Sequence, residues 1–160
     1  YPMATNDLHH EIEMIVAIGL SGSEIAKADA LDHVFGYAIG LDLTRRDLQA
    51  QAKKMSRPWD FGKSFEQGAP MTAITKTDLC GHLSSGEISL TVNDKVQQIG
   101  NLNEMIWDVP EIISFLSRFY HLEAGDLIFT GTPAGVGALD RGDKLIGRVA
   151  GLPDLAVDII

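Results

Sequence analysis

The 160-residue chain is 45% hydrophobic, a composition that suits one globular domain with its own core. Its formal net charge is −9, and basic residues are adjacent only in Arg45-Arg46 and Lys53-Lys54, which argues against nucleic acid as a partner. No apolar run approaches the roughly 20 residues of a membrane helix, and no secretory leader opens the sequence. Cys80 is the single cysteine and is interpreted as an ordinary thiol. We therefore expect a cytoplasmic protein.

The first predicted elements are two strands with a helical turn between them. Apolar residues recur at period two over residues 11–19, and the same alternation covers residues 34–43. Residues 21–31 read as a turn that leads into a short helix. Each strand is therefore expected to have one continuous apolar face.

The pattern changes its period after the second strand. Thr44 stands where an N-cap would, and Asp47 lies three residues later, as in an acidic capping box. Helix formers continue over residues 46–55, and Pro58 ends the predicted helix.

The second half of the chain is predicted to be rich in strands. Asn93-Asp94 is a hairpin signal between strands over residues 88–92 and 95–99, and Asp108 begins a second helix. Further strands are expected over residues 127–130, 145–149 and 155–160. Because helices and strands do not alternate strictly, we predict an α+β fold rather than a doubly wound sheet.

Two carboxylates stand out in the first predicted strand. Glu11 and Glu13 project from one face, about 7 Å apart along the backbone. Ile15 and Ala17 continue that face, so the strand should be covered on both sides, where desolvated carboxylates are costly. A divalent cation removes that cost because oxygen ligands at this spacing can converge on one ion. An exposed edge strand explains the spacing equally well.

Asp42 favours the metal interpretation. It ends the second apolar run, and its small neighbours Ala38 and Gly40 leave space above the face that they share with it. Thr44 already offers a helix cap, so we interpret Asp42 as a ligand at a strand end. Three carboxylates suit Mg²⁺, Mn²⁺ or Ca²⁺ and leave positions for substrate or water.

His9 suggests a different metal. On the predicted strand it shares the face of the two glutamates, and a histidine ligand would favour Zn²⁺ or Fe²⁺. Its place at the polar start of the strand is more typical of a solvated or backbone-bonded histidine, so we leave it out of the predicted ligand set.

Three further side chains are candidates for substrate chemistry. Lys63 lies among aromatic and small residues, so its stem is expected to pack and its ammonium to face a specific group, although a surface lysine is the commoner case. Arg46 and Gln49 are three apart on the predicted helix and share a face. Arginine suits a two-pronged grip on a carboxylate, while a solvated helix face explains the pair as well.

Residues 131–137, Gly-Thr-Pro-Ala-Gly-Val-Gly, follow a predicted strand directly. The segment lacks the Lys-Ser/Thr ending of a P-loop and is not a dinucleotide-binding fingerprint. A tight turn there would offer backbone N–H groups to an anionic oxygen, and a plain turn is the alternative.

In order and approximate spacing, these segments resemble the fumarylacetoacetate hydrolase family, most closely its acylpyruvate and fumarylpyruvate hydrolase branch. Each motif alone is weak, whereas the ordered set is specific and spans nearly the whole chain. The segments are residues 9–13 (His-His-Glu-Ile-Glu), 40–49 (Gly-Leu-Asp-Leu-Thr-Arg-Arg-Asp-Leu-Gln), Trp59, 62–65 (Gly-Lys-Ser-Phe) and 130–137 (Thr-Gly-Thr-Pro-Ala-Gly-Val-Gly).

The resemblance implies a role for each candidate residue. The ligands of Mg²⁺ or Mn²⁺, with Ca²⁺ as a substitute in crystals, would be Glu11, Glu13 and Asp42. Lys63 would be the catalytic or substrate-polarising group. The substrate contacts would be Arg46, Gln49 and Thr132. The implied fold is a β-rich mixed sandwich or roll with a few helices, assembled as a homodimer.

Members of this branch also carry a His and a Glu upstream of the glutamate strand, in a segment that activates water. No such segment precedes Tyr1 in the sequence. We therefore expect residues 1–160 to form a single catalytic metal-binding domain that lacks an N-terminal segment, and we leave the general base unassigned.

The expected reaction is cleavage of the C3–C4 bond of an acylpyruvate, a 2,4-dioxo acid such as fumarylpyruvate, to pyruvate and a carboxylic acid. The partner would be this small 2-oxo acid. The same enolate would arise in decarboxylation of oxaloacetate, or in isomerisation or hydration of a dienoic 2-oxo acid from aromatic catabolism. A metal- or 2-oxo-acid-binding module without turnover is the alternative from a different class.

Overall fold

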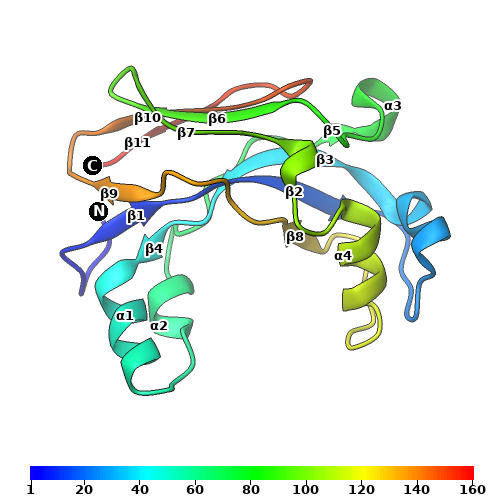
Figure 1. The fold of residues 1–160 in the computed structure, drawn as a ribbon, viewed down its shortest axis with the longest axis horizontal. Coiled ribbons are helices and arrows are strands. Elements are labelled where there is room, and N and C mark those ends of the chain that lie inside the picture. The colour runs from blue at the N-terminus through cyan, green and yellow to red at the C-terminus, as the bar shows by residue number, and fades with distance from the viewer.

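The computed structural model describes residues 1–160 and has the predicted α+β class, rich in strands (Figure 1). Its strands form three sheets. In order across each sheet, they are β4 (Thr44–Arg45), β1 (Leu8–His10) and β9 (Gly137–Leu139); β11 (Leu155–Asp158), β10 (Lys144–Val149), β6 (Glu87–Val92) and β7 (Lys95–Asn101); and β5 (Thr75–Lys76), β3 (Val34–Leu41), β2 (Ile12–Ile18) and β8 (Leu127–Phe129). The helices are α1 (Arg46–Lys54), α2 (Asp60–Lys63), α3 (Thr77–Cys80), α4 (Val109–Leu116) and the 3₁₀ helices Lys27–His33 and Leu102–Glu104.

The core lies between two layers of strands. The sheet that contains β6, β7, β10 and β11 lies over β2 and β3 (Figure 1). The predicted apolar face of the first strand is confirmed, because Ile12, Met14, Val16 and Ile18 are buried in this core. The layers approach closely at Gly147 of β10, where an added Cβ would lie only 3.0 Å from Ile12 Cδ1.

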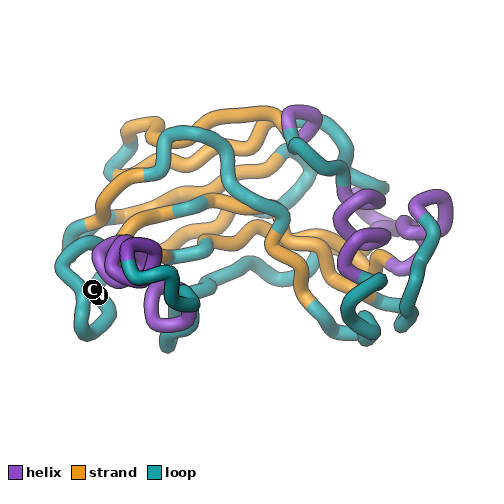
Figure 2. Tube along the Cα trace, turned by 60° about the horizontal axis from the view of Figure 1, so that its bottom comes forward, coloured by secondary structure: helices purple, strands orange, loops and turns teal.

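The longer helices lie at opposite ends of the sheets. In both views, α1 and α2 extend from the end that contains β4, while α4 lies with the 3₁₀ helix Lys27–His33 at the other end (Figures 1 and 2). None of the helices has the length and apolar character needed to span a bilayer.

The chain changes sheets at two neighbouring points. The strand predicted over residues 11–19 begins at Ile12, because residues 8–10 pair with β4 and β9 in a different sheet. Glu11 lies at this crossing, and Asp42 lies at the corresponding crossing from β3 to β4. The Asp42 N–H donates to the Glu11 carbonyl oxygen at 2.9 Å, so the two crossings are side by side.

The predicted cap of α1 is wrong. Thr44 belongs to β4, and Arg45 is the N-cap residue without a side-chain capping bond. The physical reason is that pairing of β4 with β1 keeps these residues extended. Asp47 instead accepts hydrogen bonds from Thr5 Oγ1 at 2.6 Å and from Asn6 N at 3.1 Å, which ties the start of the helix to the segment before β1.

The local signals of the second half are confirmed. Asn93 and Asp94 join β6 to β7 with φ of 49° and 64°, the left-handed conformation that a two-residue hairpin turn requires. Asp108 caps α4, and it forms a reciprocal capping box with Glu111.

Candidate metal centre

The three predicted ligands meet where the chain changes sheets. Glu13 comes from β2, Glu11 from the crossing before it, and Asp42 from the crossing after β3; each offers a carboxylate oxygen within 4.8 Å of the other two. Glu13 is 4% exposed and β2 is paired on both edges, so an exposed edge strand does not explain its position. The oxygen atoms are close enough to bind one cation together.

Gly40, next to the centre, is needed for packing and not for open space. It pairs with Glu13 across β2 and β3. An added Cβ at Gly40 would lie 2.4 Å from Ile15 Cδ1 and 2.9 Å from Phe129 Cε1. The prediction of open space above this face is therefore wrong. Apolar side chains fill that space, and they shield the face that carries the carboxylates from water.

Glu13 is the carboxylate whose ionisation is most unfavourable. Burial raises the pKa of Glu13 to about 7, although its Oε2 accepts a hydrogen bond from Gly131 N at 2.7 Å. Repulsion from the neighbouring carboxylates of Asp42 and Glu11 also raises it. A bound cation would remove this penalty, which is the chemistry that a metal site requires.

Glu11, in contrast to Glu13, is held in its ionised form. Burial works against its ionisation, but hydrogen bonds from Lys63 and Arg46 outweigh burial and hold the pKa of Glu11 below its ordinary value. Each of its two carboxylate oxygens has a cationic partner. Glu11 is therefore ionised and fixed in orientation.

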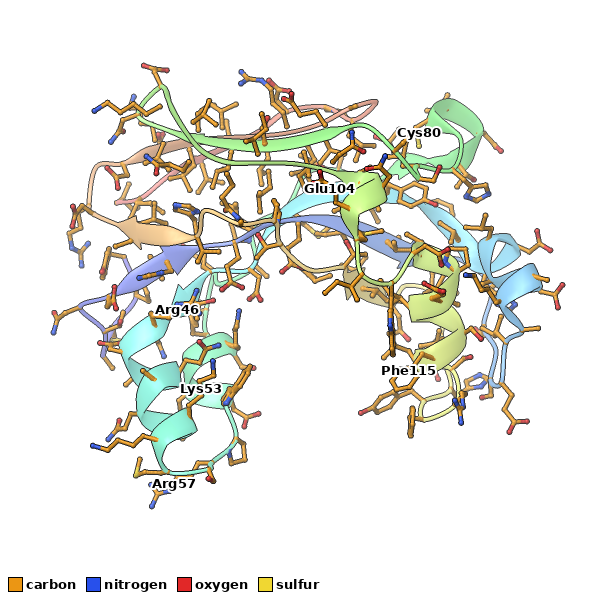
Figure 3. The ribbon with its side chains drawn as sticks, viewed as in Figure 1. Arg46, Lys53, Arg57, Cys80, Glu104 and Phe115 are labelled. Carbon is orange, nitrogen blue, oxygen red and sulfur yellow. The ribbon has the colours of Figure 1, made fainter.

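Helices α1 and α2 bring both cations to this corner. On α1, Arg46 donates to Glu11 Oε1 at 2.5 Å and to Gln49 Oε1 at 2.7 Å, and Gln49 is buried. A solvated helix face therefore does not describe this pair, and Figure 3 shows Arg46 at the end of α1 next to the strands. An added Cβ at Gly62 would lie 3.1 Å from Gln49 Cβ, so glycine lets α2 pack closely and brings Lys63 to the site.

Lys63 places its ammonium between two carboxylates. Nζ lies 2.9 Å from Glu11 Oε2 and 2.5 Å from Asp42 Oδ2, and it donates to Thr44 Oγ1 at 2.7 Å. These three bonds use every hydrogen of the ammonium. The expectation of a packed stem and a directed ammonium is confirmed, and the surface-lysine alternative is not.

His9 does not join the carboxylates. Because β1 and β2 belong to different sheets, His9 and the glutamates do not share one strand face. The ring Nε2 lies 2.9 Å from Asp7 Oδ1. The groups that converge here are all carboxylates, which favours a hard cation such as Mg²⁺ or Mn²⁺ over Zn²⁺.

The loop over residues 131–137 closes one side of the centre. Gly131 has φ of +97°, and the anion-binding N–H expected here serves the carboxylate of Glu13. Thr132 Oγ1 accepts a hydrogen bond from Gln98 Nε2 at 2.8 Å. Gln98 is fully buried and was not predicted, because no motif or spacing distinguishes it from the exposed residues beside it on β7.

A cavity of about 710 Å³ adjoins this loop. Mainly apolar side chains line it, and its wall on the loop side is formed by Thr130, Gly131 and Thr132. Two other lining residues, Glu104 and Phe115, lie toward the end of the molecule away from Arg46 (Figure 3). Thr132 therefore borders a space large enough for a small organic acid.

Known proteins are similar to this chain over almost its whole length. The family model described as fumarylacetoacetate hydrolase C-terminal matches residues 1–160. A fumarylpyruvate hydrolase from Ralstonia sp. is 45% identical over 99% of this chain and 82% of that protein. A mitochondrial oxaloacetate decarboxylase from Dictyostelium discoideum is 39% identical over 99% of this chain and 73% of that protein.

A solved structure gives the same fold. The crystal structure of fumarylpyruvate hydrolase from Pseudomonas aeruginosa in complex with Mn²⁺ and pyruvate matches with a TM-score of 0.99 at 45% identity, over 100% of this chain and 69% of that chain. The chain therefore belongs to the fumarylacetoacetate hydrolase family, as its motifs predicted. Within that family of enzymes, it is similar to hydrolases of the fumarylpyruvate type.

Proposed function

We propose that this chain is the catalytic domain of a divalent-metal-dependent hydrolase that cleaves the C3–C4 bond of an acylpyruvate such as fumarylpyruvate. One observation carries the proposal: two carboxylates from chain crossings, Glu11 and Asp42, converge with Glu13 of β2, and a lysine and an arginine are bonded to the two at the crossings. The similarity to a fumarylpyruvate hydrolase and to a structure with Mn²⁺ and pyruvate supports the choice of substrate and metal.

The residues present fit Mg²⁺ or Mn²⁺. Glu11, Glu13 and Asp42 supply only oxygen atoms, the ligand type that hard divalent cations prefer. They also supply a buried glutamate whose pKa is raised to about 7 and which a cation would stabilise as a carboxylate. When bound, the ion supplies Lewis acidity and a template for the carboxylate and 2-oxo group of the substrate.

The side chains around the ligands handle the charge that develops during the reaction. Water adds to C4, the C3–C4 bond breaks, and the electron pair of that bond becomes a pyruvate enolate that is then protonated at C3. Lys63, already fixed between two carboxylates, stabilises this negative charge. Arg46 holds Glu11 in place, Gln49 accepts a hydrogen bond from Arg46, and both face substrate at the same corner.

The loop supplies the remaining contact. Thr132 borders the cavity and offers its hydroxyl to a substrate oxygen. Activation of water is assigned to no residue of this chain. We also propose that the protein is a cytoplasmic homodimer in which residues 1–160 form one catalytic domain, as the family resemblance implies.

Decarboxylation of oxaloacetate is the second candidate. It is favoured by the 39% identity to the oxaloacetate decarboxylase from Dictyostelium discoideum. Loss of CO₂ from oxaloacetate leaves the same pyruvate enolate, so Lys63 would have the same role. The two reactions differ in whether water must be added to a carbonyl carbon.

Loss of ultraviolet absorbance of acetylpyruvate and fumarylpyruvate, with Mn²⁺ or with EDTA, tests the proposal. We expect metal-dependent loss with one pyruvate formed per substrate. Asp42→Asn should abolish it, and Asp29→Asn, a change of an exposed aspartate at the other end of the molecule, should not. Pyruvate formed from oxaloacetate but from neither acylpyruvate would contradict hydrolysis and favour the second candidate.

A further inference from the structure

Strand β7 holds the loop that follows β8. Gln98 donates from Nε2 to Thr132 Oγ1 and to the Pro133 carbonyl oxygen, both at 2.8 Å. Two residues later along the loop, an added Cβ at Gly135 would lie 2.2 Å from the Gln97 carbonyl oxygen, so only glycine fits against the strand. The position of the Thr132 hydroxyl is therefore set by β7.

The orientation of the Gln98 amide is determined at both of its ends. The Ile12 N–H can only donate, and it lies 3.1 Å from Oε1, which must be the carbonyl oxygen. The Pro133 carbonyl can only accept, and it lies 2.8 Å from Nε2, which must be the amide nitrogen. Neither contact involves an assumption about Thr132.

The direction of the Thr132 hydrogen bond follows. Because Gln98 Nε2 donates, the Thr132 hydroxyl accepts. A hydroxyl has one hydrogen of its own, and this hydrogen is then free to be donated elsewhere. Thr132 lines the 710 Å³ cavity, so an oxygen atom of a bound organic acid is the acceptor that this arrangement offers it.

Gln98 has no freedom to adopt another orientation. It is 0% exposed, and its Oε1 also accepts from His10 Nδ1 at 2.8 Å. Both amide hydrogens and both acceptor sites of the side chain are therefore in use. A fully satisfied buried amide is rigid, because any rotation would leave obligatory donors or acceptors unpaired.

We propose that Gln98 is a positioning residue that makes Thr132 a hydrogen-bond donor toward a carboxylate or enolate oxygen of the substrate. This inference rests on the proposed function, since it assigns a direction to one contact in that site. Gln98 itself does not touch substrate. It acts through the hydroxyl of Thr132, and the metal ligands are not part of this chain of contacts.

Gln98→Glu reverses the direction of the contact. The carboxylate oxygen that replaces Nε2 only accepts, so Thr132 donates to it and no longer to substrate, and the Pro133 carbonyl oxygen loses its donor. In the full-length protein, we expect KM for the acylpyruvate and Kd for pyruvate to rise by about tenfold to a hundredfold, the loss of one hydrogen bond to a charged group. The Kd for Mn²⁺ should show no comparable change. Gln97→Glu, the same substitution at an exposed position of β7, should alter neither.

Measurements in a Thr132→Val variant distinguish a positioning role of Gln98 from a merely structural one. Thr132→Val removes the hydroxyl at constant shape. If Gln98 acts through Thr132, adding Gln98→Glu to Thr132→Val should cause almost no further rise in either constant. Gln98→Met, which avoids a buried charge, should give a smaller rise than Gln98→Glu because the hydroxyl is then free to rotate. Circular dichroism establishes that each variant is folded.

Two results would overturn the inference. Equal weakening of Mn²⁺ and pyruvate binding would mean that Gln98 only holds the loop that carries Gly131, the donor to Glu13. Additive effects of Gln98→Glu and Thr132→Val would mean that Thr132 does not transmit the effect. A wild-type protein that binds pyruvate with Mn²⁺ but cleaves no acylpyruvate would contradict the proposed function. The Kd values of the variants for pyruvate would then still test the role of Gln98.

Discussion

The two ends of the molecule are built in opposite ways. Beside α1 and α2, charged side chains are bonded to one another at defined atoms, as in the contacts of Lys63 with Glu11 and Asp42. Beside α4, the cavity is mainly apolar, and its neighbourhood includes Trp107 packed on Phe115 with ring centroids 4.6 Å apart. The first end presents charged groups and hydrogen bonds at fixed positions, and the second presents an apolar cavity.

The difference shows why the chain crossings are the reactive part of the fold. A side chain in the middle of β2 is surrounded by apolar neighbours, whereas a crossing brings together side chains from two sheets and from the helix that follows. Glu11 and Asp42 lie at such crossings and are bonded through their backbones. Substitutions at this end should therefore change chemistry, and substitutions at the α4 end should not.

The largest effect is expected for Lys63→Met. Loss of a fixed positive charge beside the developing negative charge should lower kcat by about 10²- to 10³-fold. Steady-state kinetics with an acylpyruvate measures it, and Lys54→Met, an exposed lysine on α1, is the matched control. A fall in kcat as small as that of the control would remove Lys63 from the reaction.

Arg46→Met should have a smaller effect, on the metal and not on the chemical step. Without Arg46, one oxygen of Glu11 loses its partner, and loss of such outer contacts weakens metal affinity by about 10- to 100-fold. Isothermal titration with Mn²⁺ measures this change. Arg57→Met, at the far end of the same region (Figure 3), should leave the affinity unaltered. Equal affinities for the two variants would contradict the bond to Glu11.

The pH dependence of Mn²⁺ binding should report on Glu13. The pKa of about 7 in the folded, metal-free protein exceeds the ordinary value of 4.5, so the folded state keeps a proton that the unfolded state has released. Metal-free stability should therefore fall as pH rises from 4.5 through 7. Mn²⁺ must displace that proton, so its affinity should fall by at most about tenfold per pH unit below 7.

Calorimetry of Mn²⁺ binding near pH 6 in two buffers of different protonation enthalpy measures the released proton directly. Glu13→Gln removes one of the three converging carboxylates together with its proton, so this variant should show neither measurable Mn²⁺ binding nor proton release. Binding without proton release in the wild type would contradict the position assigned to Glu13.

The smallest effect is expected at the α4 end. Ile106 lines the cavity and is 96% exposed, so Ile106→Ser should change the free energy of unfolding by no more than about 0.5 kcal/mol. The Kd for Mn²⁺ should be unchanged. A weaker Mn²⁺ affinity in this variant would break the comparison, because it would show that the two ends are energetically coupled.

Local sequence signals predicted much of the fold. The alternation of Ile12, Met14 and Val16 places β2 correctly, and Asn93-Asp94 and Asp108 mark the hairpin and the start of α4. In each case the information is within a few neighbouring residues, because turn conformation and capping bonds are local.

The crossing at Glu11 could not be predicted in this way. Residues 8–10 pair with residues 44–45 and 137–139, and contacts so distant in sequence leave no trace in the alternation of residues 9–19. The same pairing keeps Thr44 in β4, so Thr44 does not cap α1 as predicted. The spacing of Glu11 and Glu13 left a metal site and an exposed edge strand open, and Asp42 at a strand end favoured the metal site, where the three carboxylates do meet.

Gln98 is the second feature that the sequence could not predict. It lies on a strand among exposed residues, and its partners come from β1, β2 and the loop after β8. A glutamine in a strand is usually read as solvated, and only the assembled fold shows that this one is buried and fully bonded.

Isothermal titration of Mn²⁺ into the wild type and Asp42→Asn tests the central claim most directly. We expect one Mn²⁺ per chain in the wild type and no measurable binding in Asp42→Asn, because the substitution keeps the size of the side chain but removes one of three converging carboxylates. Asp29→Asn, at an exposed position, should bind like the wild type. Undiminished Mn²⁺ binding by Asp42→Asn would contradict the metal centre and the mechanism built on it.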